Sequence, residues 1–260
     1  MIDIQKERPE YEMPIDMVGI RGLKYPIRVL DRENKHQDTV AEIAMFVDLP
    51  KQCRGTHMSR FVEVLSKYCG EIAYKELKPI LLEMRDVFEA QSAHLSMKFP
   101  YFIKKKAPVS KSEALMEYTA LFEAYLRADK YDFELGAIVP VATLCPCSKE
   151  ISERGAHNQR ALVTIKVRYK EFIWLEELIE YAENAASAPV FSILKRQDEK
   201  HITEHAYDNP KFVEDIVREI AQKLSNDENI THFHIEAESA ESIHNHNAFA
   251  MIETKLRSKE

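Results

Sequence analysis

Residues 113–143, EALMEYTALFEAYLRADKYDFELGAIVPVAT, decide how this chain of 260 residues is organised. Residues 113–127 and 131–143 are each predicted to form a long strand, with a joint near Ala128-Asp129-Lys130 between them. The order of strands and helices predicted before this joint is repeated after it. Because a repeated order says more than any single element, we predict two similar modules, over residues 26–128 and 129–260.

Each module is predicted to have the element order ββααββ. In the first, we expect strands at 25–30 and 39–49, helices at 59–68 and 74–90, and strands at 94–104 and 113–127. In the second, we expect strands at 131–143 and 159–169, helices at 174–186 and 210–224, and strands at 231–238 and 247–255. Apolar residues spaced three and four apart indicate the helices, and apolar alternation indicates the strands.

The predicted fold class is therefore α+β, with two tandem ββααββ modules. Each module is expected to be an antiparallel sheet with a helix pair on one face. The alternative is that the repeated order arises by chance. The first 25 residues are polar, contain proline and lack a periodic pattern, so we predict an N-terminal arm over residues 1–25.

The composition is that of an ordinary globular protein and argues against several function classes. No stretch approaches the roughly 18 consecutive apolar residues of a membrane span. The net charge of −7 argues against broad nucleic-acid binding. The sequence contains neither a G-x-G-x-x-G motif nor a P-loop, so neither kind of nucleotide site is supported. The charged N-terminus has no apolar signal region, so we expect a cytoplasmic protein whose four cysteines are thiols.

Two cysteines and a histidine form the strongest chemical signal in the chain. Cys145 and Cys147 flank Pro146 directly after a predicted strand, and His157 follows in a short polar loop. Thiolate and imidazole together are a metal-binding pair, and either cysteine can instead act as a nucleophile or acid. A short helix is expected to start here with Ser148 as its N-cap. The alternative is two thiols that only pack, beside an exposed loop histidine.

The C-terminal part adds further residues of ligand type. His201 and His205 lie at helical i, i+4 spacing, in a stretch that also holds acids. Glu214 falls in the first turns of the helix predicted at 210–224, and residues 238–247 form a polar loop dense in acids and imidazoles. Each of these charges taken alone is more simply a solvated surface residue.

An early segment, residues 54–61, has the character of an anion site. Ser59 can cap the helix predicted there, and His57 and Arg60 lie at the N-terminus of that helix. A helix N-terminus with a nearby guanidinium group favours phosphate. The alternative is a simple helix start.

Taken together, five motifs resemble those of type IB GTP cyclohydrolases, prokaryotic enzymes of folate biosynthesis in the tunnelling-fold superfamily. The motifs are RGTHMSRF at 54–61, TLCPCSK at 143–149, GAHNQR at 155–160, the stretch from DEK at 198–200 to NPKFVED at 209–215, and ESAESIHNH at 238–246. The resemblance spans nearly the whole chain. It implies the tunnelling fold, built from two ββααββ modules, and a homotetramer with active sites at subunit interfaces.

The same resemblance implies a reaction and a metal. The reaction converts GTP and water into 7,8-dihydroneopterin triphosphate and formate, the first step of tetrahydrofolate biosynthesis. Such an enzyme is a hydrolase acting on C–N bonds in cyclic amidines. It implies one divalent ion per active site, which is zinc, manganese or iron. Most of the metal site is expected in the second module.

Roles for individual residues also follow from the resemblance. Three residues are implied as metal ligands: Cys145, His157 and Glu199. Three more are implied as catalytic residues: Cys147, Glu241 and His244. Four are implied to bind GTP, the first at the guanine edge and the others at the phosphates: Glu214, Arg60, Lys149 and Arg154.

These residue types suit the chemistry. A metal bound by thiolate, imidazole and carboxylate lowers the pKa of its water towards 7, so that hydroxide can attack C8 of guanine. The later proton transfers need groups such as His244, Glu241 or Cys147. Glu214 can accept two hydrogen bonds from guanine N1–H and the 2-amino group, a contact that rejects adenine.

Two alternatives remain at the level of the sequence. A related tunnelling-fold enzyme that reduces a nitrile on a 7-deazaguanine uses a cysteine at a Cys-Pro turn as a covalent nucleophile, with NADPH and no metal. The second cysteine, His157 and the 241–244 loop favour the cyclohydrolase. The other alternative is a non-catalytic oligomer in which zinc, held by the cysteines and His157, only stabilises structure.

Overall fold

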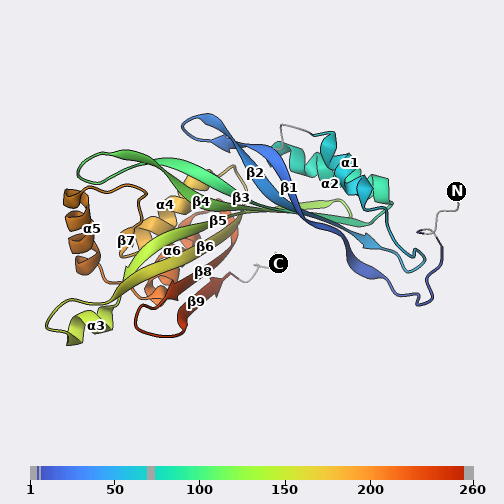
Figure 1. Cartoon of the computed structure of the whole chain (residues 1–260). Coiled ribbons are helices and arrows are strands. Elements are labelled where there is room, and N and C mark those ends of the chain that lie inside the picture. The colour runs from blue at the N-terminus through green and yellow to red at the C-terminus, as the bar shows by residue number, and fades with distance from the viewer. Residues whose placement is uncertain (1–4, 6, 69–73, 255–260) are drawn as a thin grey trace. The chain divides into compact units, whose positions relative to one another are not determined.

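The computed structural model describes residues 5, 7–68 and 74–254 (Figure 1). Residues 1–4 and 6 of the predicted arm, and Lys255 at the end of the last predicted strand, lie outside the described residues. The first half of the chain contains strands β1 (Ile15–Asp31) and β2 (Lys35–Leu49), helix α1 (Ser59–Ser66), the 3-10 turn η2 (Tyr74–Glu76), helix α2 (Leu77–Phe88), and strands β3 (Ser92–Lys106) and β4 (Glu113–Arg127).

The second half repeats this order with three additions. It contains β5 (Lys130–Leu144), α3 (Pro146–Ile151), β6 (Asn158–Tyr169), α4 (Leu175–Ala185), β7 (Ala188–Pro189), α5 (Arg196–Asp208), α6 (Val213–Asn226), β8 (Ile230–Ala240) and β9 (Asn247–Glu253). Without the additions α3, β7 and α5, both halves have the order ββααββ. The predicted α+β class and repeated element order are therefore confirmed.

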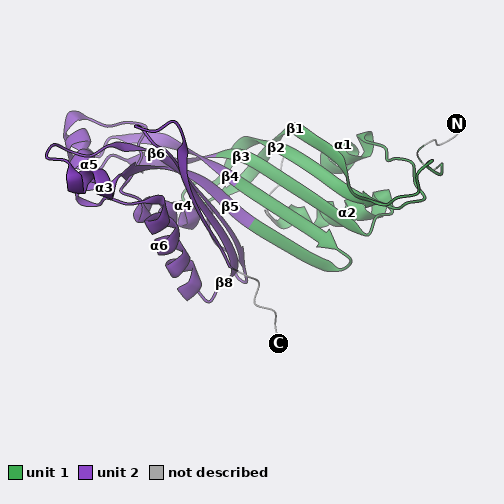
Figure 2. Cartoon of the chain, turned by 90° about the horizontal axis from the view of Figure 1, so that it is seen from below, with its two compact units in different colours: residues 1–100, 121–134 green, residues 101–120, 135–260 purple. Residues whose placement is uncertain are grey.

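Hydrogen bonding joins the strands in the order β1-β2-β3-β4-β5-β6-β8-β9, with β7 paired to β5. Strand pairing is antiparallel along β1–β2–β3 and along β5–β6–β8–β9, as predicted. By packing, the chain forms two compact units, residues 1–100 with 121–134 and residues 101–120 with 135–260 (Figure 2). These units group residues by contact, so the repeat boundary expected between residues 128 and 129 stays a prediction.

In the first unit, α1 and α2 pack together on one face of the sheet (Figure 2). Apolar side chains of the helices and of every second strand position form the core: Phe61, Val64 and Leu65 of α1, Leu77, Ile80, Leu81 and Met84 of α2, and Ile43, Met45 and Val47 of β2. Each large aliphatic side chain buried in this way stabilises the folded state by about 1.5–3 kcal/mol.

In the second unit, α4 and α6 pack on each other and on strands β6 and β8. Of the apolar stripe predicted at Phe212, Ile216, Ile220 and Leu224, the last three are buried in α6, whereas Phe212 is exposed and is the N-cap. The helix therefore starts at Val213 and not at residue 210, and it ends at Asn226. Both units thus carry a helix pair whose spacing of apolar residues was visible in the sequence. Among the described residues, no helix combines the length and the apolar character needed to cross a membrane.

Strand β1 starts at Ile15, well before the strand expected at 25–30. Register shifts interrupt its pairing with β2, one of them between Ile20 and Leu23, where Gly22 has a positive φ of 72°. A bulge of this kind breaks the alternation by which a strand is detected in a sequence. The close approach of β1 to β2 also requires glycine, because a Cβ at Gly19 would lie 1.8 Å from the carbonyl oxygen of Met45.

Helix α5 was not expected as a separate element, because only Asp198 and Ala206 of its residues are buried and no apolar stripe marks it. The Asp198 carboxylate anchors it instead. Oδ1 accepts the N–H groups of Val109 and Ser110 at 2.9 and 2.8 Å, and Oδ2 accepts the Ser110 hydroxyl at 2.6 Å and the Lys195 N–H at 2.8 Å. Burial raises the pKa of this carboxyl, but the hydrogen bonds from Ser110, Lys195 and Val109 outweigh burial and hold the pKa well below its usual range.

Replacing Asp198 with asparagine is expected to lower the melting temperature by several degrees near neutral pH, because the amide presents a donor where the carboxylate accepts. The lowered pKa means that this stabilisation is present above the unfolded pKa of about 4 and is lost as the pH falls through the folded value. The difference in melting temperature between variant and wild type should therefore narrow in acid, as measured by circular dichroism. Asp208→Asn, exposed at the other end of α5, is the control. Equal melting of Asp198→Asn and wild type at pH 7 would contradict the anchor.

Candidate active site

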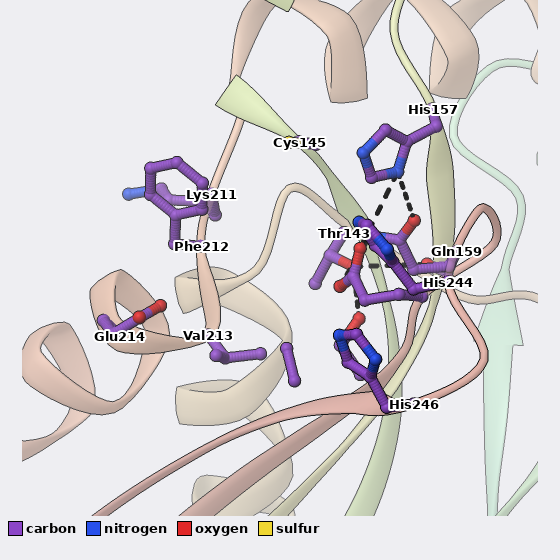
Figure 3. Close-up of a pocket in the computed structure, with 13 residues that line it drawn as sticks. Thr143, Cys145, His157, Gln159, Lys211, Phe212, Val213, Glu214, His244 and His246 are labelled. Carbon is purple, nitrogen blue, oxygen red and sulfur yellow. Dashed lines mark hydrogen bonds and ion pairs between the residues drawn. The ribbon is translucent and has the colours of Figure 1, made fainter. Parts of the chain in front are cut away.

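A pocket of about 270 Å³ lies in the second unit (Figure 3). Its lining comes from four segments of the chain. Thr143 and Cys145 lie at the end of β5, and His157 and Gln159 at the start of β6. The start of α6 and the residues before it provide Lys211, Phe212, Val213 and Glu214. The β8–β9 hairpin provides Ser239, Glu241, His244, His246 and Ala248. Acids, imidazoles and a thiol therefore converge on one hollow, a common arrangement for a small-molecule site.

Cys145 is the residue at which β5 gives way to α3. Its Sγ accepts the Ser148 N–H at 3.4 Å, and Pro146 occupies the first helical position, where proline costs no hydrogen bond. The prediction that Ser148 caps this helix is wrong, since Cys145 is the N-cap. The Ser148 hydroxyl instead donates to the Cys145 carbonyl at 3.2 Å and accepts the His157 N–H at 3.2 Å.

The thiol and the imidazole are held at the same end of the sheet. Antiparallel pairing sets Leu144 opposite Asn158, and the Cys145 N–H donates to the His157 carbonyl at 3.1 Å. The Nδ1 atom of His157 lies 2.9 Å from Gln159 Oε1 and 3.7 Å from Glu241 Oε2. Only 14% of the His157 side chain and 16% of the Glu241 side chain are exposed, so this contact is largely shielded from water.

Two more imidazoles stand beside this pair. The rings of His244 and His246 stack with their centroids 5.0 Å apart. Figure 3 shows both rings on the same side of the pocket as His157, with Glu214 on the other side. A ligand between the two sides would meet imidazoles at one end and a carboxylate at the other.

Glu214 lies in the first turn of α6, and the start of this helix is held by one backbone bond to the β5 end and by one side-chain cap. The Lys211 N–H donates to the Leu144 carbonyl at 3.1 Å, and Asp215 accepts the Phe212 N–H at 3.0 Å. The first bond joins the segment before α6 to the strand that carries Cys145. One backbone hydrogen bond therefore ties the start of α6, which carries Glu214, to the strand end that carries the thiol.

The pocket's lysine is already paired. Lys211 Nζ donates to Glu219 at 2.9 Å, and Lys223 donates to the same carboxylate at 2.9 Å. Burial raises the pKa of Glu219, but the bonds from Lys223 and Lys211 outweigh it and lower that pKa, so the carboxylate stays charged at neutral pH.

Comparison with known protein families shows which family this chain belongs to. The model of the family described as type I GTP cyclohydrolase folE2 matches residues 1–250. The chain belongs to this family. It is 53% identical over 259 residues to the GTP cyclohydrolase FolE2 of Geotalea uraniireducens (strain Rf4), covering 100% of this chain and 95% of the relative. It is 56% identical over 256 residues to the GTP cyclohydrolase FolE2 of Thermosipho melanesiensis, covering 98% and 99%.

Solved structures show the same fold at low sequence identity. A uricase from Bacillus fastidious matches with a TM-score of 0.54 and 10% identity, over 95% of this chain and 93% of that chain. The urate oxidase of Bacillus sp. TB-90 matches with a TM-score of 0.54 and 11% identity, over 93% and 100%. These likenesses concern the fold alone, and they confirm the predicted tunnelling fold.

The pocket unites five residues predicted from the resemblance to the cyclohydrolase family: Cys145, His157, Glu214, Glu241 and His244. The other five lie outside its lining within the described part of the chain. Three of them are exposed: Cys147 on α3, Arg154 in the loop before β6, and Glu199 on α5. Lys149 donates to the Tyr207 carbonyl, and its Nζ lies 4.3 Å from the centroid of the Tyr207 ring. Arg60 lies in α1 of the first unit. The roles of all ten stay predictions.

The start of α1 differs from expectation. Its N-cap is Met58, and no side chain caps it, so the predicted capping by Ser59 is wrong. The Arg60 N–H donates to the His57 carbonyl at 3.1 Å, which closes the first turn without a hydroxyl. The motif at residues 54–61 therefore contributes a helix start of ordinary backbone geometry.

Sequence reasoning missed several lining residues of this cyclohydrolase-family chain. Among them are the polar residues Thr143, Gln159, Ser239 and His246. All four lie inside motifs already noted at 143–149, 155–160 and 238–246, so the signal was present. Nothing local distinguishes Thr143, Gln159 and Ser239 from surface residues, because they contact one another across neighbouring strands. His246 stacks on His244 of the same connection.

The chemistry of the pocket suits the divalent ion implied by the resemblance. Thiolate sulfur, imidazole nitrogen and carboxylate oxygen are all zinc ligands. Nδ1 of His157 faces oxygen atoms, which directs Nε2 towards a ligand, as in metal-binding histidines held from behind by an oxygen. Across residues 5, 7–68 and 74–254, no group of three or more His, Cys, Asp or Glu side chains is close enough to hold an ion alone.

Proposed function

We propose that this chain is a GTP cyclohydrolase that converts GTP and water into 7,8-dihydroneopterin triphosphate and formate, in folate biosynthesis. The main support for this proposal is the family match over residues 1–250, together with relatives that are more than half identical over nearly all of the chain. The pocket supports it, since five residues predicted for this chemistry meet there. The nitrile reductase and the non-catalytic zinc oligomer are not favoured by this family membership.

Glu214 is proposed to select guanine. Its carboxylate stands at the exposed start of α6, on the side of the pocket opposite the imidazoles (Figure 3). Two carboxylate oxygens can accept from guanine N1–H and the 2-amino group at once. A purine held there would extend towards His157, Glu241 and His244.

Cys145 and His157 are proposed to hold a divalent ion, with Glu199 as the third ligand. When bound, such an ion supplies Lewis acidity that brings the pKa of water towards neutrality. Glu241 and His244 are proposed to move protons during ring opening and formate release. Cys147, on the turn after Cys145, is proposed as a further proton donor.

The homotetramer is proposed as the unit that completes the site. Glu199 is exposed on α5 and outside the pocket lining, so a second copy is one way to bring it to the ion. The sheet of the second unit also ends in β9, which is an edge strand. Across β6, β8 and β9, the exposed residues Leu162, Glu238 and Phe249 lie opposite one another in register. An exposed apolar pair beside an edge strand favours coverage by another chain.

The purified full chain, incubated with GTP and Zn²⁺ or Mn²⁺, is expected to release formate and a pterin that fluoresces after oxidation. A chelator should remove the activity, and added metal should restore it. No formate with any divalent ion would overturn the proposed reaction. Full turnover after exhaustive chelation would overturn the metal requirement while leaving the reaction in place.

A further inference from the structure

Gln159 occupies the centre of the polar contacts in the pocket, and neither the family resemblance nor the motif reasoning gave it a role. Its Nε2 donates to Thr143 Oγ1 at 3.1 Å and to Glu241 Oε1 at 3.3 Å. Its Oε1 accepts from His157 Nδ1 at 2.9 Å and from Ser242 Oγ at 3.5 Å. One carboxamide thus contacts both the predicted ligand His157 and the predicted proton carrier Glu241.

The orientation of this amide follows from chemistry. An ionised carboxylate can only accept hydrogen bonds, so the nitrogen end of Gln159 must face Glu241. The oxygen end then faces His157, and because a carbonyl oxygen can only accept, Nδ1 of the imidazole must carry the proton. In the neutral ring this leaves the lone pair on Nε2.

Two buried hydroxyl groups support the carboxamide of Gln159. Thr143, 2% exposed, accepts from Gln159, and its Oγ1 lies 3.3 Å from that of Ser239, which is fully buried. These hydroxyls stand in a layer that is otherwise apolar, with Val141, Ala161 and Ala237 as their neighbours along the strands. A pair of hydroxyls in such a layer costs stability unless it is bonded, so the network favours one amide orientation.

We propose that Gln159 is a positioning residue that sets the tautomer of His157 and the direction of Glu241. The inference deepens the proposed function, and it rests on His157 being a metal ligand there. Gln159 touches neither the ion nor the substrate in this account. It presents Nε2 of His157 as the coordinating atom and keeps the Glu241 carboxylate beside it.

Two variants separate the effect of Gln159 on His157 from its effect on Glu241. Gln159→Leu removes both the acceptor for His157 and the donor for Glu241. Gln159→Glu keeps an acceptor for His157 but sets a second carboxylate against Glu241. Gln52→Leu, at an exposed glutamine of the first unit, is the matched control.

The tautomer is read by solid-state NMR of the full chain labelled with 15N-histidine, without metal and at about pH 9, where imidazole is neutral. The His157 signal is assigned by its loss in His157→Gln. Wild type, Gln52→Leu and Gln159→Glu should show the proton on Nδ1, and Gln159→Leu should show a mixture of tautomers. A purely structural role of Gln159 would not move this signal.

Metal affinity gives the second readout. Titration with Zn²⁺ against a competing chelator should show binding weakened about ten- to hundredfold in Gln159→Leu, the usual cost of losing a partner that orients a ligand. Gln159→Glu should recover the affinity but not the turnover of GTP, because Glu241 is displaced.

The results distinguish this inference from the proposed function. A wild-type His157 protonated on Nε2, or a tautomer unchanged in Gln159→Leu, overturns the inference even if GTP is turned over. The expected tautomers and affinities in a protein that releases no formate overturn the proposed reaction and leave the inference standing. If Gln159→Leu does not fold, the wild-type tautomer and Gln159→Glu decide the question.

Discussion

Replacing Glu214 with alanine is expected to reduce kcat/KM for GTP at least about a thousandfold while leaving bound metal unchanged. The physical reason is that a site built to receive two donors loses both contacts at once, and discrimination by such paired bonds is large. The carboxylate lies in the first turn of α6, on the side of the pocket away from the imidazoles (Figure 3). Steady-state kinetics and metal analysis on the same preparation measure both quantities.

A substrate lacking the 2-amino group sharpens this test. Wild type should prefer GTP strongly over inosine triphosphate, and Glu214→Ala should lose most of that preference because the acceptor is gone. Glu228→Ala, exposed beyond the other end of α6, should behave as wild type. A Glu214→Ala enzyme that still prefers GTP as strongly as before would place guanine recognition elsewhere.

Replacing Cys145 with alanine is expected to remove most of the bound divalent ion and to lower turnover by more than about a hundredfold. Loss of a ligand should exceed the ten- to hundredfold cost usual for a residue that only orients one. Cys145 is suited to this role because its backbone N–H is bonded to the carbonyl of His157, which holds the thiol and the imidazole at one strand end. Metal content by plasma mass spectrometry and formate release are the measurements.

The other cysteines provide controls of matched chemistry. Cys53→Ala, in the first unit, should retain both metal and turnover. Cys147→Ala removes an exposed thiol two residues away and should retain the metal while slowing turnover. Full metal occupancy in Cys145→Ala would remove Cys145 from the ligands, and metal loss in Cys147→Ala alone would assign that role to Cys147.

Much of the fold was predictable because periodicity reports which face of an element is buried. The stripe of Ile216, Ile220 and Leu224 indicated α6, and the alternation through Ile43, Met45 and Val47 indicated β2. The elements that escaped prediction lack that signal. Strand β1 is interrupted by a bulge at Gly22, and α5 is polar apart from two buried positions.

For the site, the sequence by itself determined the residue types and motifs: the thiols after β5, the loop histidine, the acid at the start of α6 and the imidazoles near residue 244. Only the tertiary structure decided which of them meet. Pairing of β5 with β6 joins Cys145 to His157, and the β8–β9 connection adds Glu241. Gln159 gained its role through the link that it forms between its neighbour His157 and the residues Thr143 and Glu241, which lie 16 and 82 residues away. Hydrogen bonds between such distant residues leave no local pattern, because a polar side chain at a strand end reads the same whether it faces water or a partner.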